Sequence, residues 1–502
     1  MTKPGPSCPA LYEINTRTWL DGLSRQRGRA VTLADIDDAT LDQLQKRGFD
    51  WIWLLSVWPT GAASRAVSRH HPAWRTSFEQ ALPDLTEDDI AGSGFAVAGY
   101  RVDPALGGPT ALAGLRARLA ERGMRLMLDF VPNHTALDHP WTQSNPEFFI
   151  EGDAPSLAQA PDSYVRVPSG EGFRILAHGR DPNFPAWPDT LQLNYGSAAL
   201  QAAQVAELLT IAECCDGVRC DMAMLLLPEV FHRTWGIDAE PFWPTAIASV
   251  RQAHPGFTFL AEAYWDLEWE LQQQGFDFCY DKRLFDRLRT GDATSVRAHL
   301  DAGLDYQSRL ARFLENHDEP RAAKTFPLPQ HKAAAAITYL SPGLRFFHQG
   351  QLGGARVQVP VHLRRAPAEP YDADIARFYM RLLSVLRATA ALREGDWAPL
   401  APRPAWAGNP TWSDFVCALW QGRDEGLCLV AVNYCDHQAQ CRLYLPLPDL
   451  ATRRFRLVDL MGNEIYLRDG RELATSGLYL DLAPWRFNLF RLEDVPDAGA
   501  AN

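Results

Sequence analysis

The chain has 502 residues, of which 46% are hydrophobic and 22% charged, proportions that are ordinary for a soluble globular protein. This length exceeds one compact core, so two or three domains are expected. The net charge of −12 offers no basic surface to DNA or RNA, and no apolar run approaches the roughly 18 residues of a membrane span. We therefore expect neither a nucleic acid nor a membrane as a partner.

The cysteines indicate free thiols. There are nine, an odd number, and none stand in a C-x-x-C arrangement. Disulfide frameworks belong to oxidising compartments. The first ten residues hold Lys3, Pro4 and Pro6 but no apolar segment of a secretory signal. These features favour a cytoplasmic protein.

Strand-like and helix-like segments alternate from the start of the chain to about residue 390. In chain order, the predicted strands are 11–15, 51–57, 125–131, 217–221, 258–261, 276–280, 311–314 and 344–348. Apolar residues at helical spacing predict helices between them, for example 110–122, 198–215 and 374–390. Such alternation favours a parallel sheet with crossover helices, and eight strands close a (β/α)₈ (TIM) barrel.

Two regions depart from this alternation. About 80 residues separate His134 from the next strand, far more than a βα loop needs, and 146–188 is rich in Pro, Gly and Asp. We predict a small inserted domain there. After about residue 392, short alternating strands at 415–420, 427–433, 442–445, 454–459, 477–482 and 486–491 predict a C-terminal antiparallel β-sandwich. The predicted domains are 1–140 (barrel, first part), 141–195 (inserted domain), 196–393 (barrel, second part) and 394–502 (C-terminal domain).

Four short segments place polar groups after predicted barrel strands. They are DFVPNH (129–134), GVRCD (217–221), LAEA (260–263) and ENHD (315–318). The carboxyl-terminal ends of barrel strands are where such a fold builds its active site. Three acids, two histidines and an arginine are therefore expected in one pocket, which is the equipment for cleaving a glycosidic bond.

Cleavage with retention needs a proton donor and a second carboxylate about 5–5.5 Å away that attacks the anomeric carbon. Asp221 and Glu262 end neighbouring predicted strands, which fits this geometry. Arg219 points to the same face as Asp221 and is expected to keep it ionised as the nucleophile. Glu262 lies among apolar and aromatic residues, which raise a carboxyl pKa as a proton donor requires.

The remaining polar groups complete the predicted site. Asp318 is a third carboxylate that can stabilise positive charge on the sugar as the bond breaks. His134 and His317 can donate hydrogen bonds to sugar hydroxyls. Asp129 is interpreted as a structural hydrogen-bonding residue and not as a catalyst.

The four segments resemble, in order, the four signature regions of the α-amylase superfamily, and the inserted and C-terminal domains extend the resemblance over nearly the whole chain. The resemblance implies a barrel enzyme with Asp221 as nucleophile, Glu262 as general acid/base and Asp318 as transition-state stabiliser. It also implies that Arg219, His134 and His317 line the subsite of the sugar being cleaved.

Weaker similarities add two substrate-binding residues. Phe95, in GFAVAGY (94–100), lies where family members carry an aromatic residue that stacks on the sugar. Arg321 is similar to a residue in the family's α-glucosidase-like members. Trp58, Trp187 and Tyr264 could line the groove or pack in the core. The segment WPDTLQLN (187–194) lies where family members have a fifth, variable motif, and its function stays open.

The chain also departs from the family pattern. Typical α-amylases carry Lys and His three and four residues after the nucleophile, where this chain has Met224 and Leu225. Asn133 alone is no calcium site, because calcium takes six to eight oxygen ligands. We therefore expect no metal and no other cofactor. Ala96 replaces the Asp with which the family's α-glucosidases grip terminal glucose.

These patterns favour a retaining α-glycosidase that hydrolyses short α-glucosides or malto-oligosaccharides through a covalent glycosyl-enzyme. The alternative is a transglycosylase or glucosyltransferase with a sucrose- or maltose-type donor and the same catalytic residues. A non-catalytic carbohydrate-binding barrel is a third hypothesis, against which the presence of all three carboxylates speaks. The sequence sets no oligomeric state, and the expected partner is a small sugar or oligosaccharide.

Overall fold

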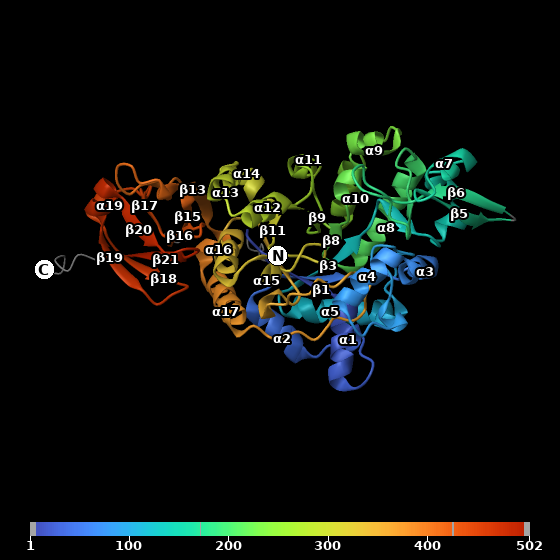
Figure 1. The fold of residues 1–502 in the computed structure, drawn as a ribbon, viewed down its shortest axis with the longest axis horizontal. Coiled ribbons are helices and arrows are strands. Elements are labelled where there is room, and N and C mark those ends of the chain that lie inside the picture. Colours follow the sequence, from blue (N-terminus) through green and yellow to red (C-terminus); the bar gives the residue numbers. More distant parts are fainter. Residues whose placement is uncertain (1–6, 171, 424–425, 496–502) are drawn as a thin grey trace.

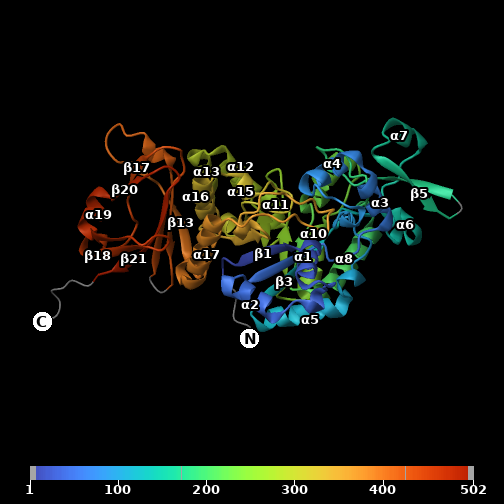
Figure 2. The same cartoon turned by 60° about the horizontal axis from the view of Figure 1, so that its bottom comes forward.

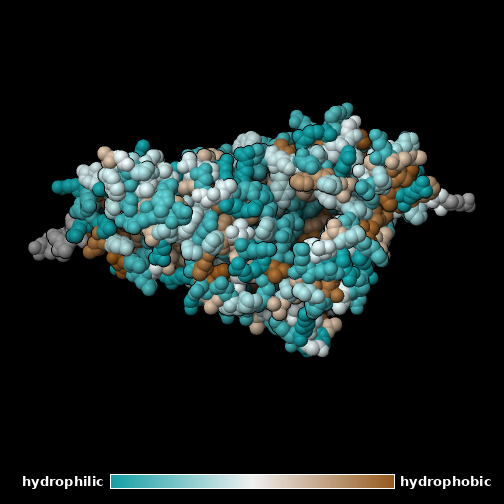
Figure 3. Space-filling view, viewed as in Figure 1, coloured by the Kyte–Doolittle hydropathy of each residue, from teal (hydrophilic) through white to brown (hydrophobic). Residues whose placement is uncertain are grey.

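The structure is a computed structural model that describes residues 7–170, 172–423 and 426–495. The molecule is elongated, with a barrel in the middle, the C-terminal domain at one end and the inserted domain at the other (Figures 1 and 2). Its visible face in Figure 3 is mostly hydrophilic, with hydrophobic residues in small separate groups. In the described part of the chain, no helix is both long and apolar enough to cross a membrane.

Eight parallel strands form a closed barrel, which confirms the predicted fold. They are β1 (Ala10–Asn15), β2 (Trp51–Leu55), β3 (Arg125–Phe130), β8 (Gly217–Cys220), β9 (Thr258–Ala261), β10 (Phe278–Tyr280), β11 (Leu310–Arg312) and β12 (Leu344–His348), in this spatial order. β2 ends two residues before the predicted boundary because Ser56 has a left-handed backbone (φ 65°), which stops strand pairing. All nine cysteines are free thiols.

Helices surround the barrel and bury their apolar faces against it (Figure 1). The larger ones are α1 (Thr16–Arg27), α2 (Asp38–Arg47), α5 (Gly108–Glu121), α8 (Ala198–Cys214), α10 (Phe242–Ala253), α12 (Lys282–Thr290), α13 (Ala293–Leu300), α16 (Leu328–Tyr339) and α17 (Ala373–Ala388). Side chains cap the N-termini of several helices. Ser197 accepts a hydrogen bond from the N–H of Leu200 in α8, and Asp281 accepts one from the N–H of Leu284 in α12.

Two excursions from the barrel rise beside the strand ends. After β3, β4 (His134–Ala136) pairs antiparallel with β7 (Thr190–Gln192), and β5 (Tyr164–Ser169) forms a hairpin with β6 (Gly172–Ala177). After β2, α3 (Ala62–His70) and α4 (Pro72–Ala81) form an excursion that was not predicted from the sequence. Phe78 of α4 packs with Ile90 and with Leu363, which follows β12.

The C-terminal domain consists of two antiparallel sheets around their own core. The larger sheet contains β13 (Asp396–Leu400), β15 (Phe415–Gln421), β16 (Leu427–Asn433), β21 (Phe487–Asp494), β18 (Arg454–Asp459) and β19 (Ile465–Asp469); the smaller contains β14 (Arg403–Pro404), β17 (Ala439–Leu443) and β20 (Leu478–Leu482). β13, β14, β19 and the short helix α19 (Gly470–Ser476) were not predicted. Trp420 ties the domain to the barrel by donating to the carbonyl of Leu340 at 2.7 Å.

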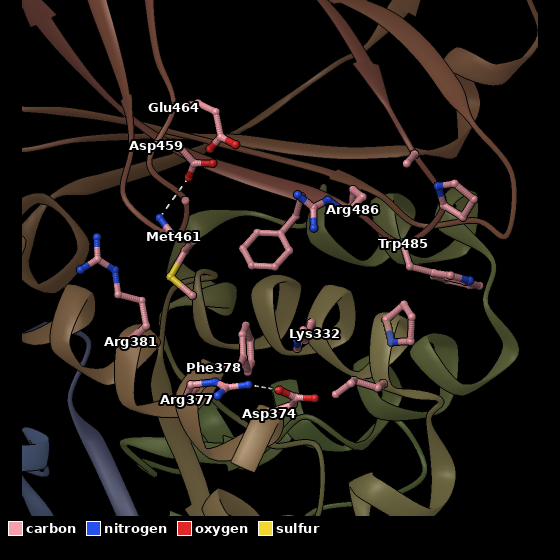
Figure 4. A pocket seen from close by; sticks show the side chains of 16 residues that line it. Lys332, Asp374, Arg377, Phe378, Arg381, Asp459, Met461, Glu464, Trp485 and Arg486 are labelled. Carbon is pink, nitrogen blue, oxygen red and sulfur yellow. Dashed lines mark hydrogen bonds and ion pairs between the residues drawn. The ribbon is translucent and has the colours of Figure 1, made fainter. Parts of the chain in front are cut away.

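A cleft of about 590 Å³ separates the C-terminal domain from α16 and α17 (Figure 4). Its walls carry the ion pair between Asp374 and Arg377, and Asp459, which accepts a hydrogen bond from the N–H of Met461 at 3.0 Å. None of the predicted site residues line this cleft.

Candidate active site

A cavity of about 320 Å³ opens at the carboxyl-terminal end of the barrel. It brings together five of the eight predicted site residues. Its described lining consists of Trp74, Ser93, Phe95, His134, Trp187, Asp189, Thr190, Asp221, Met222, Glu262, Tyr264, Asp318 and His362. Arg219, His317 and Arg321 are not in this lining.

Asp221 and Glu262 are the first residues past two neighbouring strands, β8 and β9, in which Cys220 is paired with Ala261. Their own N–H groups continue the strand bonding, because Asp221 donates to the carbonyl of Phe130 at 2.8 Å and Glu262 to that of Cys220 at 3.1 Å. Both carboxylates are therefore held by rigid backbone and face one cavity.

Arg219 lies beneath this pair, fully buried. Its Nη1 is 2.6 Å from Oδ1 of Asp221, and its Nη2 is 2.7 Å from Oε2 of Glu262. Its Nε donates to the hydroxyl of Tyr280 at 3.3 Å. The contact with Asp221 was predicted from the sequence, whereas the contact with Glu262 was not. One guanidinium thus sets the positions of both carboxylates.

The two carboxyl groups have raised pKa values. Burial raises the pKa of Glu262 to about 7, against the charge of Arg219 and the hydrogen bond from the N–H of Met222. The hydroxyl of Tyr264 donates to its Oε1 at 3.0 Å. Burial also raises the pKa of Asp221, and Arg219 opposes this shift. The shift at Asp221 runs against the expectation that Arg219 dominates there, because removing the carboxylate from water outweighs the ion pair.

Asp318 belongs to a chain of charges that includes His317 and Glu13. Nε2 of His317 is 3.0 Å from Oδ2 of Asp318, and its Nδ1 bonds to Oε1 of Glu13 on β1. Burial of the ring lowers its pKa, but the two carboxylates outweigh this and raise the pKa of His317 well above its ordinary value. Although desolvation acts to raise the pKa of Asp318, His317 holds it below its ordinary value. His317 is thus a cation that keeps Asp318 ionised.

His134 and Phe95 line the cavity directly. Burial lowers the pKa of His134 to about 4, so its ring is neutral at pH 7 and can both donate and accept. The ring of Trp187 lies 5.1 Å from it. The guanidinium of Arg219 lies 5.0 Å from the ring centre of Phe95. Trp187 and Tyr264 line the cavity, whereas Trp58 is core.

Arg321 and Asp129 lie outside the cavity and bond to other groups of the same chain. Arg321 donates to Oε1 of Glu315 at 2.6 Å and to the carbonyl of Val357 at 3.0 Å. Arg321 was predicted to bind substrate. The structure differs from this prediction, because the guanidinium is hydrogen-bonded to buried groups of the protein. Asp129 accepts from the indole N–H of Trp53 and the N–H of Ser56, both at 3.2 Å, as a structural residue does.

Arg321→Ala is expected to lower the free energy of unfolding by about 3–5 kcal/mol, because it removes the arginine that is paired with the buried carboxylate of Glu315. Urea unfolding measures this loss. Arg321→Lys is the matched control; it keeps the charge but not the fork of donors, and should lose less. Unchanged stability together with a raised KM would instead support contact with substrate.

Asn133, Met224 and Leu225 do not offer a set of side-chain oxygens to a calcium ion. The side-chain oxygen of Asn133 accepts from Nε2 of Gln192 at 3.0 Å, and Met224 and Leu225 are buried apolar residues. Calcium requires several oxygen ligands around one point. Among the described residues, one group of three His, Cys, Asp or Glu side chains lies close enough together to share a metal ion. It lies in the C-terminal domain and consists of Asp414, Cys435 and His437.

Six lining residues were not predicted from the sequence, among them Trp74 on α4, Asp189 before β7 and His362 after β12. The fifth-motif segment contained Asp189 without indicating a role. Trp74 and His362 carried no signal in the sequence, because helix α4 and the loop after β12, which are far apart in the chain, bring them to the cavity.

Comparisons with known proteins agree with this architecture. The family model "Alpha amylase, catalytic domain" matches residues 33–166. The chain is 23% identical to α-amylase MalA of Haloarcula japonica over 69% of its own length and 44% of that protein. It is 26% identical to the α-1,4-glucan:maltose-1-phosphate maltosyltransferase of Rhodospirillum rubrum over 52% of its length and 32% of that protein. The matches thus span less than half of these two relatives.

Solved structures show the same fold over nearly all of the chain. A maltogenic α-amylase of Thermotoga neapolitana superposes with a TM-score of 0.69 at 17% identity, covering 97% of this chain and 99% of that one. A cyclomaltodextrinase superposes with a TM-score of 0.65 at 17% identity, covering 97% and 78%. Residues 33–166 thus match the α-amylase catalytic-domain model, and the chain has the closed-barrel fold of these solved α-amylases.

Proposed function

We propose that the protein is a retaining α-glycosidase that hydrolyses short α-glucosides or malto-oligosaccharides through a covalent glycosyl-enzyme. The observation that carries this proposal is a pair of ion pairs made by Arg219. Its Nη1 lies 2.6 Å from Asp221, and its Nη2 lies 2.7 Å from Glu262. Two carboxylates on one guanidinium lie close together, as direct attack requires. Inverting enzymes need a wider separation to admit a water molecule.

In the first step, Asp221 attacks the anomeric carbon while Glu262 gives its proton to the departing glycosidic oxygen. A pKa near 7 leaves much of Glu262 protonated at neutral pH, as a proton donor must be. Asp318, kept ionised by His317, stabilises the positive charge that develops on the sugar. In the second step, Glu262 takes a proton from water, and the resulting hydroxide equivalent displaces Asp221.

The size of the cavity supports a short substrate. At about 320 Å³ it lies at the lower end of the range for ligand sites, about 300–1,000 Å³. Transglycosylation is the alternative, in which a sugar hydroxyl replaces water in the second step. It is favoured by the similarity to a protein named as a maltosyltransferase. We place the protein in the cytoplasm, a proposal supported by its free cysteines.

The test is incubation with maltose, maltotetraose, trehalose and sucrose, followed by proton NMR from the first minutes. Glucose or maltose released first as the α-anomer would support retaining hydrolysis and identify the substrate. Longer or mixed oligosaccharides without matching free sugar would make the protein a transferase. Initial release of the β-anomer would contradict the retaining mechanism.

A further inference from the structure

One buried carboxylate in the cavity has an oxygen without a hydrogen-bond partner. Asp189 is 3% exposed and lines the same cavity as Asp221 and Glu262. Its Oδ2 is buried and unpaired, and Nε2 of His362 lies 3.8 Å away, beyond hydrogen-bond reach. Because leaving a buried polar atom unpaired costs free energy, such an oxygen in a cavity indicates a ligand that completes it.

The backbone holds Asp189 in this position. Its carbonyl accepts from Oγ of Ser64, a buried residue of α3, at 2.7 Å. The next residue, Thr190, donates from its N–H and its hydroxyl to the carbonyl of Trp187, at 3.1 and 2.9 Å. The carboxylate is therefore aimed into the cavity before any ligand arrives, and binding requires little reorganisation.

His362 faces Asp189 from an equally fixed wall. Its ring packs against Trp74 and Phe78 of α4, with ring centres 4.6 and 5.4 Å away. Its carbonyl accepts from the N–H groups of Ala91 and Gly92, at 2.8 and 3.1 Å. The loop after β12, the α3–α4 excursion and the inserted domain thus meet at one side of the cavity.

The charges in the cavity restrict what can bind there. Four carboxylates, those of Asp189, Asp221, Glu262 and Asp318, are in its lining, and no Lys or Arg is among the described lining residues. A phosphate group would meet like charge without a cationic partner, which is unfavourable in a buried site. Neutral hydroxyls, by contrast, donate well to an ionised carboxylate, and its two oxygens accept from two donors at once.

We propose that Asp189 determines sugar specificity, accepting hydrogen bonds from two adjacent hydroxyls of the bound sugar while His362 contacts the same sugar. The site then selects neutral glycosides with both hydroxyls free over phosphorylated or deoxygenated ones. This inference rests on the proposed glycosidase function. The carboxylate that recognises the sugar would then come from the inserted domain, and not from position 96, where this chain has Ala.

The test measures kcat/KM on 4-nitrophenyl α-d-glucopyranoside and on its four analogues that lack the 2-, 3-, 4- or 6-hydroxyl. Asp189→Asn should lower kcat/KM on the parent compound about 10- to 150-fold, the effect of losing hydrogen bonds to a charged group. Wild-type enzyme should lose a similar factor on the analogues without the recognised hydroxyls. For Asp189→Asn, kcat/KM on those analogues should be only slightly lower than its kcat/KM on the parent compound. A residue with a purely structural role would not show this coupling between the substitution and the missing hydroxyls.

Asp162→Asn is the matched control, because Asp162 is an exposed aspartate of the inserted domain outside the cavity lining. It should behave as wild type on all five compounds. If every hydroxyl deletion costs the same factor in wild type and in Asp189→Asn, the proposal is wrong while the glycosidase function stands. If thermal melting shows that Asp189→Asn does not fold, His362→Gln takes its place. The same five compounds then show whether this substitution and the loss of a hydroxyl have non-additive effects on kcat/KM.

Failure of the glycosidase function itself is recognised separately, since wild type would then turn over none of the five compounds. Calorimetric titration with glucose and maltose decides the role of Asp189 in that case. Affinity at least tenfold lower in Asp189→Asn than in wild type would support it. Equal affinities, or no binding by either protein, would overturn it.

Discussion

Asp221→Asn is expected to lower kcat by about four to six orders of magnitude on every glycoside that the wild-type protein cleaves. The amide has nearly the same shape as the carboxylate, so the cavity should keep its form, but it cannot attack the anomeric carbon. Initial rates on maltose and on 4-nitrophenyl α-glucoside measure the loss. Calorimetry with maltose should show that sugar affinity is largely kept.

Two controls separate loss of the nucleophile from loss of structure. Thermal melting reports whether the change disturbs Arg219, which loses one of its buried partners. Azide added to Asp221→Gly should restore cleavage of the activated aryl glycoside and yield the β-glycosyl azide, because the small anion attacks from the vacated side. Near-native activity of Asp221→Asn would show that another group is the nucleophile.

Glu262→Gln is expected to lower kcat/KM about 10²- to 10⁴-fold on maltose but far less on 4-nitrophenyl α-glucoside. Only the sugar leaving group needs a proton as the bond breaks, since nitrophenolate leaves unaided. The ratio kcat/KM reports the steps up to the glycosyl-enzyme and isolates this difference from the second step. Equal losses on both substrates would argue against the proton-donor role.

The pH profile provides a second reading of the same residue. Because the pKa of Glu262 is raised to about 7, its proton is present below that pH and is lost above it. Wild-type kcat/KM on maltose should therefore fall as pH rises through about 7, and this alkaline limb should be absent in Glu262→Gln. Tyr264→Phe is the matched control, because it removes the 3.0 Å hydrogen bond to Oε1 but keeps the carboxyl group and should keep the limb.

Local patterns were sufficient to predict the barrel and three of the four cavity carboxylates, those of Asp221, Glu262 and Asp318. A buried parallel strand is a short apolar run, and the residue that follows it points to the active-site end, so Asp221 and Glu262 could be placed from their own segments. The short strands and the α3–α4 excursion escaped prediction because their sequences lack a clear period. β14, for example, has only two residues.

Contacts between distant segments required the tertiary structure. His317 bonds to Glu13, 304 positions away, and Arg321 is held by groups on β12 and the loop after it. The sequence could indicate that His317 and Arg321 lie near the strand ends, but not which partners occupy their nitrogens, because barrel closure and loop packing decide that.

By itself, then, the sequence determined the fold class and the three carboxylates at its strand ends, because both depend on short apolar runs and the residues that follow them. Only the tertiary structure decided how those carboxylates are held and what surrounds them. Arg219 joins Asp221 to Glu262 through the pairing of β8 with β9. Asp189 and His362 face each other because the inserted domain, the α3–α4 excursion and the loop after β12 pack together, and contacts between segments so far apart in the chain have no period that a sequence can display.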